Sequence, residues 1–304
     1  MGQYSYFRGQ IVPNEEAKIS IQTHAFLYGT AVFEGIRAYW VEEEQQLYVF
    51  RMLEHYQRLH NSGRIFLMKP SLSPEEMCTV TVELLQKNHF TADTYIRPIL
   101  YKSGEAVGIK CHDMADDFLI FAVPFGAYLD TSKGLKVKVS SWRHLEDNMI
   151  PMRAKCNGAY VNAVLAKNDA VMDGYDEAIY LTSDGHVSEG TGENLFIVRN
   201  GRLITSPFTA DILEGITRDS VVTLAREELG LEIEERPIDR TELYVCDEAF
   251  FTGTAAQVAP ITEIDHRPVA NGKVGPISKK LQELYFDVVK GKNPKYRKWL
   301  TPVY

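Results

Sequence analysis

The chain has 304 residues, of which 45% are hydrophobic and 24% are charged. This composition excludes a disordered or fibrous protein, and the length suffices for two domains or one large domain. The formal net charge of −8 argues against nucleic acid as the main partner, because binding a phosphate backbone requires a basic surface.

Further sequence features bear on the cellular location. The longest apolar run, at residues 118–129, is too short for a membrane span. The N-terminus lacks the basic-then-apolar pattern of a secretory signal, and the four cysteines form no Cys-x-x-Cys pair, as is typical of reduced thiols. The histidines form no metal-binding motif. We therefore expect a cytoplasmic protein with no membrane segment and no metal site.

The first part of the chain is predicted to combine strands with two helices. Ser73-Pro74-Glu75-Glu76 is a helix start with a hydroxyl cap, a proline in the first turn and a glutamate in capping-box position. An earlier helix at 53–62 places Leu53 on its core face and Arg58 on another face. Strands are expected in a hairpin around Gly9 and at 45–50, 94–102 and 117–124, the last two of them buried.

A linker is expected at residues 125–135, and strands and helices alternate after it. Asn200-Gly201 lies between two apolar stretches and predicts a two-residue hairpin turn. Gly230 is placed to end a helix at 217–229. Strands are expected at 136–141, 177–182, 194–199, 202–205, 233–239, 248–252 and 260–265, with further helices at 158–173 and 275–290. This order predicts an α+β protein with domains at 1–124 and 136–304.

Lys155 lies directly ahead of a predicted helix, in Ile-Pro-Met-Arg-Ala-Lys-Cys-Asn-Gly-Ala-Tyr-Val-Asn at residues 150–162. A lysine whose amine is held neutral by its surroundings can perform Schiff-base chemistry. A lone lysine is more often a surface residue. The interpretation therefore depends on a second stretch, Val-Ser-Glu-Gly-Thr-Gly-Glu-Asn-Leu-Phe at residues 187–196.

Together the two stretches resemble the signature of the fold-type IV pyridoxal-phosphate enzymes, and within them the branched-chain amino acid aminotransferases. The resemblance extends over nearly the whole chain and includes Phe-Glu-Gly-Ile-Arg at 33–37 and Phe-Gly-Ala-Tyr-Leu at 125–129. It implies two α/β domains with largely antiparallel sheets and a site at the domain interface. Cys156-Asn157 departs from the family, in which small residues are commoner there; we expect this to alter local packing only.

The resemblance implies pyridoxal 5'-phosphate as cofactor. Lys155 would bind it covalently and carry a proton between the substrate Cα and the cofactor. Glu189 would keep the pyridine nitrogen protonated, so that the ring accepts electrons, and Tyr160 would hydrogen-bond the ring hydroxyl oxygen.

The phosphate site has partial support from the residues themselves. Leu-Glu-Gly-Ile-Thr-Arg-Asp at 213–219 leads from a glycine-containing turn into a helix, and the N–H groups and dipole at a helix N-terminus favour a phosphate. Many loops enter helices in this way, so the motif alone is weak. The resemblance assigns the phosphate contacts to Arg58, Ile216, Thr217 and Thr254.

The resemblance also assigns the residues that bind the substrate. The α-carboxylate would be held by Tyr95 and the turn Thr254-Ala255, and the side chain by Phe33, Phe125 and Tyr128. A neighbouring subunit would contribute Tyr28, Val107 and Ile109, which implies a homo-oligomer based on a dimer.

Both leucine and glutamate would have to fit one pocket. Burying the distal carboxylate of glutamate without a partner is unfavourable by several kcal/mol, so a cation is expected at the pocket edge. Arg97 is the candidate, because it lies two residues from Tyr95 in a predicted strand and hence on the same face. Arg37 is the second candidate, and an arginine held in a structural ion pair is the alternative interpretation of Arg97.

We therefore expect a branched-chain amino acid aminotransferase that moves the amino group between leucine, isoleucine or valine and 2-oxoglutarate in ping-pong steps. D-amino acid transaminases, aminodeoxychorismate lyases and R-selective amine transaminases would share Lys155, Glu189 and the phosphate site. Activity with D-alanine, aminodeoxychorismate or simple amines would distinguish them.

Two further interpretations belong to other classes. His186-Val-Ser188-Glu-Gly190 is similar to a hydrolase nucleophile elbow, but it lacks the first glycine and the following helix. A non-catalytic binding protein is also conceivable, and a colourless purified protein would favour it.

Overall fold

The computed structural model describes residues 3–126 and 133–304, which form two compact units. The first unit contains residues 3–126, 154–158 and 288–304, and the second contains residues 133–153 and 159–287. The predicted domains at 1–124 and 136–304 and the linker at 125–135 stay a prediction, and residues 127–132 of that linker lie outside the described residues.

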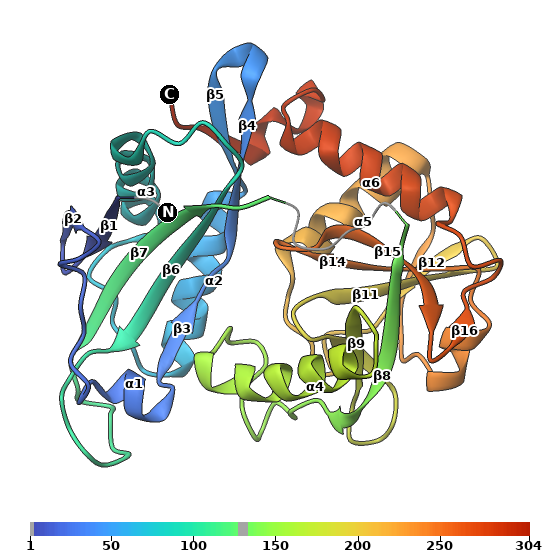
Figure 1. Ribbon diagram of the computed structural model, residues 1–304, viewed down its shortest axis with the longest axis horizontal. Helices are drawn as coiled ribbons and strands as arrows, with labels where there is room; N and C mark the ends of the chain where they lie inside the picture. Colours follow the sequence, from blue (N-terminus) through green and yellow to red (C-terminus); the bar gives the residue numbers. More distant parts are fainter. Residues whose placement is uncertain (1–2, 127–132) are drawn as a thin grey trace. The chain divides into compact units, whose positions relative to one another are not determined.

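An antiparallel sheet is the framework of the first unit (Figure 1), with strand order β17-β5-β4-β6-β7-β1-β2 and with β3 paired to β6. Its strands are β1 (Tyr4–Phe7), β2 (Gln10–Pro13), β3 (Ala31–Phe33), β4 (Ile36–Val41), β5 (Gln46–Phe50), β6 (Thr94–Lys102), β7 (Asp116–Pro124) and β17 (Leu300–Pro302). Its helices are α1 (His24–Tyr28), α2 (Met52–Ile65) and α3 (Pro74–Asn88), with 3-10 helices η1 (Glu42–Glu44) and η4 (Pro294–Trp299).

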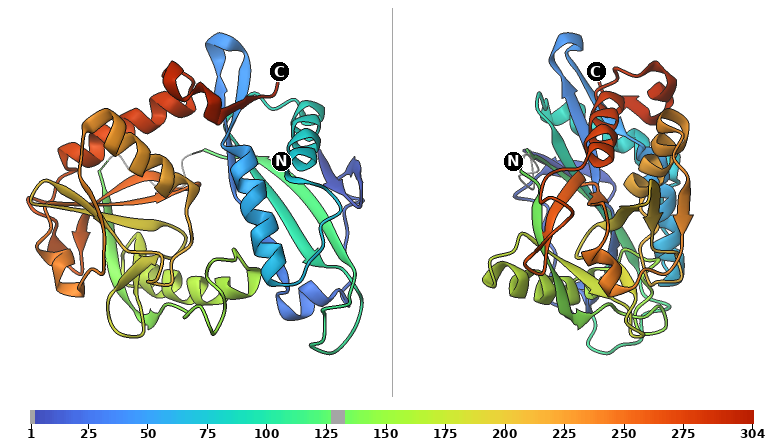
Figure 2. Two further views of the ribbon diagram at one scale, coloured as in Figure 1. Left: turned by 180° about the vertical axis from the view of Figure 1, so that it is seen from behind. Right: turned by 90° about the vertical axis from the view of Figure 1, so that its right-hand side faces the viewer.

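The two faces of this sheet have different surroundings. One face is buried against α2, the blue helix beside the strands in the left view of Figure 2. There the Tyr56 ring meets the Phe118 ring edge-on, with 6.3 Å between the ring centroids. On β6 buried residues alternate with half-buried ones from Thr94 to Leu100. The expected full burial of β6 and β7 is therefore wrong, because only alternate side chains of a strand reach the helix-covered face. The half-buried face carries Tyr95 and Arg97.

Local sequence signals explain the helices of this unit. Helix α3 begins with the predicted capping box, in which the Ser73 hydroxyl accepts from the Glu76 N–H and the Glu76 carboxylate accepts from the Ser73 N–H. Helix α2 buries Met52, Tyr56 and Leu59. Leu53 is exposed, so its predicted place on the core face is wrong; the buried stripe starts one residue earlier.

A mixed sheet is the framework of the second unit, with strand order β10-β9-β8-β15-β14-β11-β12-β13 and with β16 paired to β15. Its strands are β8 (Leu135–Arg143), β9 (Glu177–Leu181), β10 (Val187–Gly190), β11 (Asn194–Arg199), β12 (Arg202–Thr205), β13 (Ile233–Glu235), β14 (Glu248–Gly253), β15 (Gln257–Ile264) and β16 (Arg267–Pro268). Its helices are α4 (Tyr160–Met172) and α5 (Ile216–Leu229), with the 3-10 helix η3 (Arg240–Tyr244). The 3-10 helix η2 (Asn157–Ala159) and helix α6 (Pro276–Val289) contain residues of both units.

Helices and turns shape this second sheet. Helix α4 packs on β8 and β9, and α5 packs on β14 (Figure 1). The hairpin of β11 and β12 forms at the predicted turn, where Asn200 and Gly201 both have positive φ, at 51° and 75°, as a type I′ turn requires. Strand β10, which carries Glu189, was not predicted; its four residues are all buried and show no alternation. Within the described residues, no helix is long and apolar enough to cross a membrane.

Candidate active site

Lys155 belongs to the first unit, where its backbone is fixed from both sides. The Phe33 N–H donates to the Lys155 carbonyl oxygen at 2.9 Å, and the Lys155 N–H donates to the Ser62 hydroxyl at 3.3 Å. The Lys155 side chain is half-buried, with its Nζ 5.2 Å from the centroid of the Phe33 ring. Strand β3 and helix α2 thus hold the lysine beside an aromatic side chain.

Tyr95 lies close to the backbone that follows Phe33. A Cβ atom added to Gly35 would lie 2.4 Å from the Tyr95 hydroxyl oxygen, so a side chain at this position would displace the phenol. Arg37 and Tyr95 are register partners on β4 and β6, and Phe33 pairs with Ile99 on β6. Register partners lie on one face of a sheet, so Phe33, Arg37, Tyr95 and Arg97 share a face, as predicted for Tyr95 and Arg97.

Arg97 is held by aromatic groups. Its NH2 donates to the Tyr95 hydroxyl at 2.7 Å, and its guanidinium carbon lies 4.3 Å from the centroid of the Phe33 ring. In the described part of the chain no carboxylate pairs with it, and its buried Nε has no hydrogen-bond partner. The alternative interpretation of Arg97, a structural ion pair, therefore has no support from the described residues.

Arg37 has a different role in this structure. Its NH2 donates to the carbonyl oxygens of Phe125 and Gly126, at 3.0 and 2.7 Å, and its guanidinium carbon lies 5.4 Å from the centroid of the Phe125 ring. Arg37 thus fixes the end of the segment that follows β7. Tyr128, predicted as part of the side-chain pocket, lies outside the described residues.

Arg58 forms a buried cluster with two residues that were not predicted. Its Nε and NH2 donate to the two carboxylate oxygens of Glu34, each at 2.7 Å, and His55 Nδ1 lies 2.8 Å from the same carboxylate. Glu34 is fully buried. Burial alone would raise the pKa of Glu34, but the charge of Arg58 and hydrogen bonds from Arg58 and His55 lower it to about 2. Glu34 is therefore an ionised carboxylate that orients the guanidinium.

The second unit also contains a buried carboxylate, that of Glu189. One of its oxygens accepts from Asn194 Nδ2 at 2.8 Å and from the Leu213 N–H at 3.1 Å. Asn194 Nδ2 also donates to the Leu213 carbonyl oxygen at 3.0 Å. A Cβ atom added to Gly215 would lie 1.9 Å from Asn194 Oδ1. The loop before α5 thus packs against the asparagine that holds Glu189.

His144 lies on the other side of this carboxylate, with Nε2 3.6 Å from Glu189 Oε1. Burial lowers the pKa of His144 to about 4, so its ring is neutral at pH 7. The Ser188 hydroxyl donates to the Ala210 carbonyl oxygen at 2.7 Å and faces His144 Nδ1 at 3.3 Å. Ser188 is fully buried and a strand, β11, follows its motif, so the hydrolase interpretation is wrong.

The start of α5 has the features of an anion site. Its N-cap residue is Gly215, so no side chain caps the N–H groups of the first turn. Thr217 is buried in that turn. Thr254 and Ala255 lie in the turn between β14 and β15 and are half-buried. A Cβ atom added to Gly253, before that turn, would lie 3.2 Å from the Gly192 carbonyl oxygen. The turn after β10 and the turn after β14 are therefore neighbours.

The predicted subunit-contact residues gather around α1. The Gly108 N–H donates to the Tyr28 hydroxyl at 3.0 Å, and His24 Nε2 lies 3.0 Å from the Gly108 carbonyl oxygen. These contacts hold the loop after β6 against α1. Val107 and Ile109 of this loop are 89% and 85% exposed.

Some residues of these clusters could have been found from the sequence. Glu34 and Asn194 lie inside the motifs at 33–37 and 187–196, which also contain the predicted site residues Phe33 and Glu189. His55 precedes Arg58 by three residues and so shares its helix face. His144 carries no local signal, because it comes near Glu189 only through the pairing of β8 with β9 and of β9 with β10.

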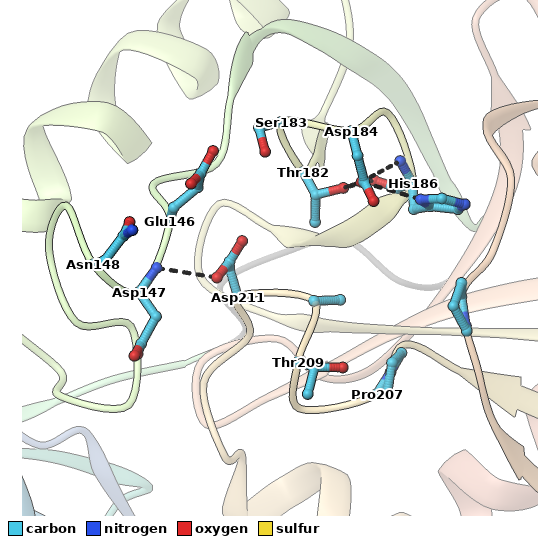
Figure 3. Close-up of a pocket in the computed structure, with 12 residues that line it drawn as sticks. Glu146, Asp147, Asn148, Thr182, Ser183, Asp184, His186, Pro207, Thr209 and Asp211 are labelled. Carbon is cyan, nitrogen blue, oxygen red and sulfur yellow. Dashed lines mark hydrogen bonds and ion pairs between the residues drawn. The ribbon is translucent and has the colours of Figure 1, made fainter.

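A surface cavity of about 510 Å³ in the second unit borders the cluster around Ser188 at Ala210 (Figure 3). It is lined by Glu146, Asp147, Asn148, Thr182, Ser183, Asp184, His186, Pro207, Thr209, Ala210, Asp211 and Pro237. In Figure 3 Asp184 faces His186, and the Asp147 N–H points to Asp211. None of the predicted site residues is among these lining residues, and the described residues contain no group suited to hold a metal ion.

Comparisons with known proteins agree with the two motifs. The family Amino-transferase class IV matches residues 31–264. The chain is 55% identical to the probable branched-chain-amino-acid aminotransferase of Aquifex aeolicus over 301 residues, which cover 99% of this chain and 97% of that protein.

Solved structures show the same fold. The branched-chain aminotransferase of Thermoproteus uzoniensis with norvaline has a TM-score of 0.96 at 43% identity, with all of both chains covered. The branched-chain amino acid aminotransferase of Thermobaculum terrenum, in its PLP-form, has a TM-score of 0.95 at 40% identity, covering 100% of this chain and 99% of that one.

Proposed function

The chain belongs to the amino-transferase class IV family, and on that premise we propose that it transfers the amino group between L-leucine, L-isoleucine or L-valine and 2-oxoglutarate. The observation that carries this proposal is the face shared by Phe33, Tyr95 and Arg97 beside Lys155. It combines an aromatic surface for an apolar side chain with a cation that no described carboxylate neutralises.

The chain's own residues fit pyridoxal 5'-phosphate. Glu189 is buried with one oxygen held by two donors, which suits a carboxylate that must stay ionised opposite a ring nitrogen. The N-terminus of α5, without a side-chain cap, suits a phosphate. When bound, the cofactor supplies an electron-accepting ring that eases removal of the substrate Cα proton.

The roles of individual residues follow from this fit. Lys155 binds the cofactor and holds the transferred proton on Nζ. Arg58, Ile216, Thr217 and Thr254 bind the phosphate, and Tyr160, the first residue of α4, bonds the ring hydroxyl oxygen. Tyr95 with Thr254 and Ala255 holds the substrate α-carboxylate, and Phe33, Phe125 and Tyr128 contact its side chain.

Two substrates of different polarity share one pocket in this proposal. Arg97 meets the distal carboxylate of glutamate or 2-oxoglutarate, because its NH2 is held by the Tyr95 hydroxyl and no carboxylate of the described residues pairs with it. Arg37 is already engaged by two backbone carbonyl oxygens, which favours a role in supporting the segment at Phe125. When leucine is bound, the Phe33 ring and the Tyr95 hydroxyl keep the Arg97 guanidinium in place.

The protein works as a homo-oligomer based on a dimer. Val107 and Ile109 are apolar and strongly exposed, while their loop is fixed to α1 at Tyr28. A fixed loop that exposes apolar side chains is typical of an association surface, and the neighbouring subunit would receive Tyr28, Val107 and Ile109 at its pocket. The free thiols and the net charge of −8 fit a cytoplasmic enzyme that acts on small molecules.

Absorbance of the purified protein tests the function. We expect a visible absorption band that disappears on addition of L-leucine and returns on addition of 2-oxoglutarate. D-alanine, simple amines and aminodeoxychorismate, added in place of L-leucine, test the other fold-type IV activities. A protein that is colourless after incubation with pyridoxal phosphate, or that responds to D-alanine and not to L-leucine, would contradict the proposal.

A further inference from the structure

We propose that Glu34 and His55 are positioning residues, which fix the guanidinium of Arg58 in the orientation that binds the cofactor phosphate. This inference rests on the proposed function, because it requires a phosphate-bearing cofactor. It goes beyond it by assigning a task to two buried residues that touch neither the cofactor nor the substrate in the proposal.

The contacts of Glu34 define one orientation of Arg58. The carboxylate accepts from Nε and from NH2 of Arg58, each at 2.7 Å, so that it meets one edge of the planar guanidinium at two points. Two parallel charge-assisted hydrogen bonds fix a planar group more strongly than a single contact does. The two contacts with Glu34 therefore set the direction in which the Arg58 guanidinium points.

His55 contacts the Glu34 carboxylate from α2, the helix that also carries Arg58. Its Nδ1 lies 2.8 Å from the Glu34 oxygen that also receives the NH2 of Arg58. Burial lowers the pKa of His55, so the ring is neutral at pH 7. Because the ionised Glu34 can only accept a hydrogen bond, the Nδ1–H of His55 is the donor. A neutral donor stabilises the ionised carboxylate without adding a positive charge that would compete with Arg58.

The neighbours of Glu34 in the chain connect this cluster to Lys155 and Tyr95. Glu34 lies between Phe33, whose N–H bonds the Lys155 carbonyl, and Gly35, which lies against the Tyr95 hydroxyl. The Glu34 N–H donates to the Pro98 carbonyl oxygen at 3.0 Å, which fixes this segment on β6. One short segment thus sets Lys155, Arg58 and Tyr95 relative to one another. Preorganised contacts of this kind lower the entropy lost on binding.

The phosphate itself supplies a specific test. A residue that positions Arg58 affects binding of pyridoxal 5'-phosphate but not of pyridoxal, which has the same ring and aldehyde and no phosphate. A residue that only supports the fold affects both equally. We would measure dissociation constants of both compounds, from their absorbance, with apoenzyme of the wild type, Glu34→Gln, Arg58→Gln and the double variant.

We expect Glu34→Gln to weaken binding of pyridoxal phosphate on the order of tenfold, the scale of one charge-assisted hydrogen bond, while pyridoxal binding changes little. In the Arg58→Gln background the same change should have little further effect. Glu54→Gln is the matched control, since Glu54 of α2 also pairs with an arginine, Arg51 at the N-cap of that helix, at 2.9 Å.

The outcomes separate the inference from the function. Equal losses for both compounds, or full additivity with Arg58→Gln, would overturn the positioning role. A phosphate-specific loss in Arg58→Gln but not in Glu34→Gln would overturn it as well and leave the proposed function intact. Wild-type protein that binds neither compound would contradict the function itself. If Glu34→Gln does not fold, His55→Gln decides by the same comparison.

Discussion

The backbone N–H of Phe33 donates to the carbonyl oxygen of Lys155 at 2.9 Å, and the adjacent Val32 forms an antiparallel bridge with Cys156. Residues 154–158 therefore extend the edge of β3 and belong to the first unit, although the residues on either side of them belong to the second. The lysine is thus fixed to the sheet whose half-buried face carries Tyr95 and Arg97.

Arg97 is expected to matter for one substrate more than for the other. Arg97→Leu should lower kcat/KM for 2-oxoglutarate. The lost transition-state stabilisation should be about 2–5 kcal/mol, the scale for losing one partner of a buried charge pair. The half-reaction with L-leucine, measured alone by single turnover, should fall far less, because leucine has no distal charge.

Arg37→Leu is the comparison for this experiment. It should affect both half-reactions to a similar extent, since Arg37 binds the backbone at Phe125 and Gly126. Equal losses in both halves for Arg97→Leu, with a selective loss for Arg37→Leu, would transfer recognition of the distal carboxylate to Arg37.

Gly215 is expected to tolerate no side chain. Gly215→Ala should destabilise the protein by about 1–3 kcal/mol, as overpacking does, because its Cβ would lie 1.9 Å from Asn194 Oδ1. The added methyl group would displace Asn194, which would then no longer donate its hydrogen bond to Glu189. The affinity for pyridoxal phosphate should therefore fall too. A Cβ at Gly192 meets no atom within 4 Å, so Gly192→Ala is the control. Similar thermal stability and affinity for both variants would contradict this packing.

His144 predicts a pH dependence of stability. Its pKa is about 4 in the folded protein, against 6.5 for a histidine in the unfolded chain. The unfolded chain therefore binds more protons between these values, and stability is present above pH 6.5 and lost as the pH falls toward 4. The difference corresponds to roughly 3 kcal/mol.

Urea unfolding of the apoenzyme at pH 7, 5.5 and 4.5 would measure this effect. His144→Gln should flatten the loss of stability with falling pH, whereas His186→Gln, which changes a partly exposed histidine, should not. An unchanged pH dependence in His144→Gln would show that His144 is not neutral in the fold.

Val107 is expected to lie in a contact between subunits. Val107→Asp should shift the protein from dimer to monomer in sedimentation experiments, because a charge would be buried without a partner. Val245→Asp, at an exposed position of the second unit, is the control. A Val107→Asp protein that remains dimeric and active would contradict this assignment.

Much of the fold could be predicted because its signals are local. The capping box at Ser73, the Asn200-Gly201 turn and Gly230 at the end of α5 all act within a few residues, and each is found where it was expected. The alternating burial of β6 was missed because it depends on which face α2 covers. Strand β10 was missed because its short sequence shows no period.

The candidate site shows the same division. The two motifs placed Lys155 and Glu189, but the partners of the buried charges come from distant residues. Glu34 is 24 residues from Arg58. His144 is 45 residues from Glu189 and is brought near it by the pairing of β9 with both β8 and β10. No periodicity or local motif reports such pairs, because they form only when the sheets form.

The lysine that binds the cofactor can be identified by fixing the cofactor on it with a reductant. The protein would be incubated with pyridoxal phosphate, reduced with borohydride and digested, and the peptides analysed by mass spectrometry. We expect one labelled peptide, with the label on Lys155, and none from a Lys155→Ala protein. A label on another lysine of the wild type, or no label at all, would contradict it.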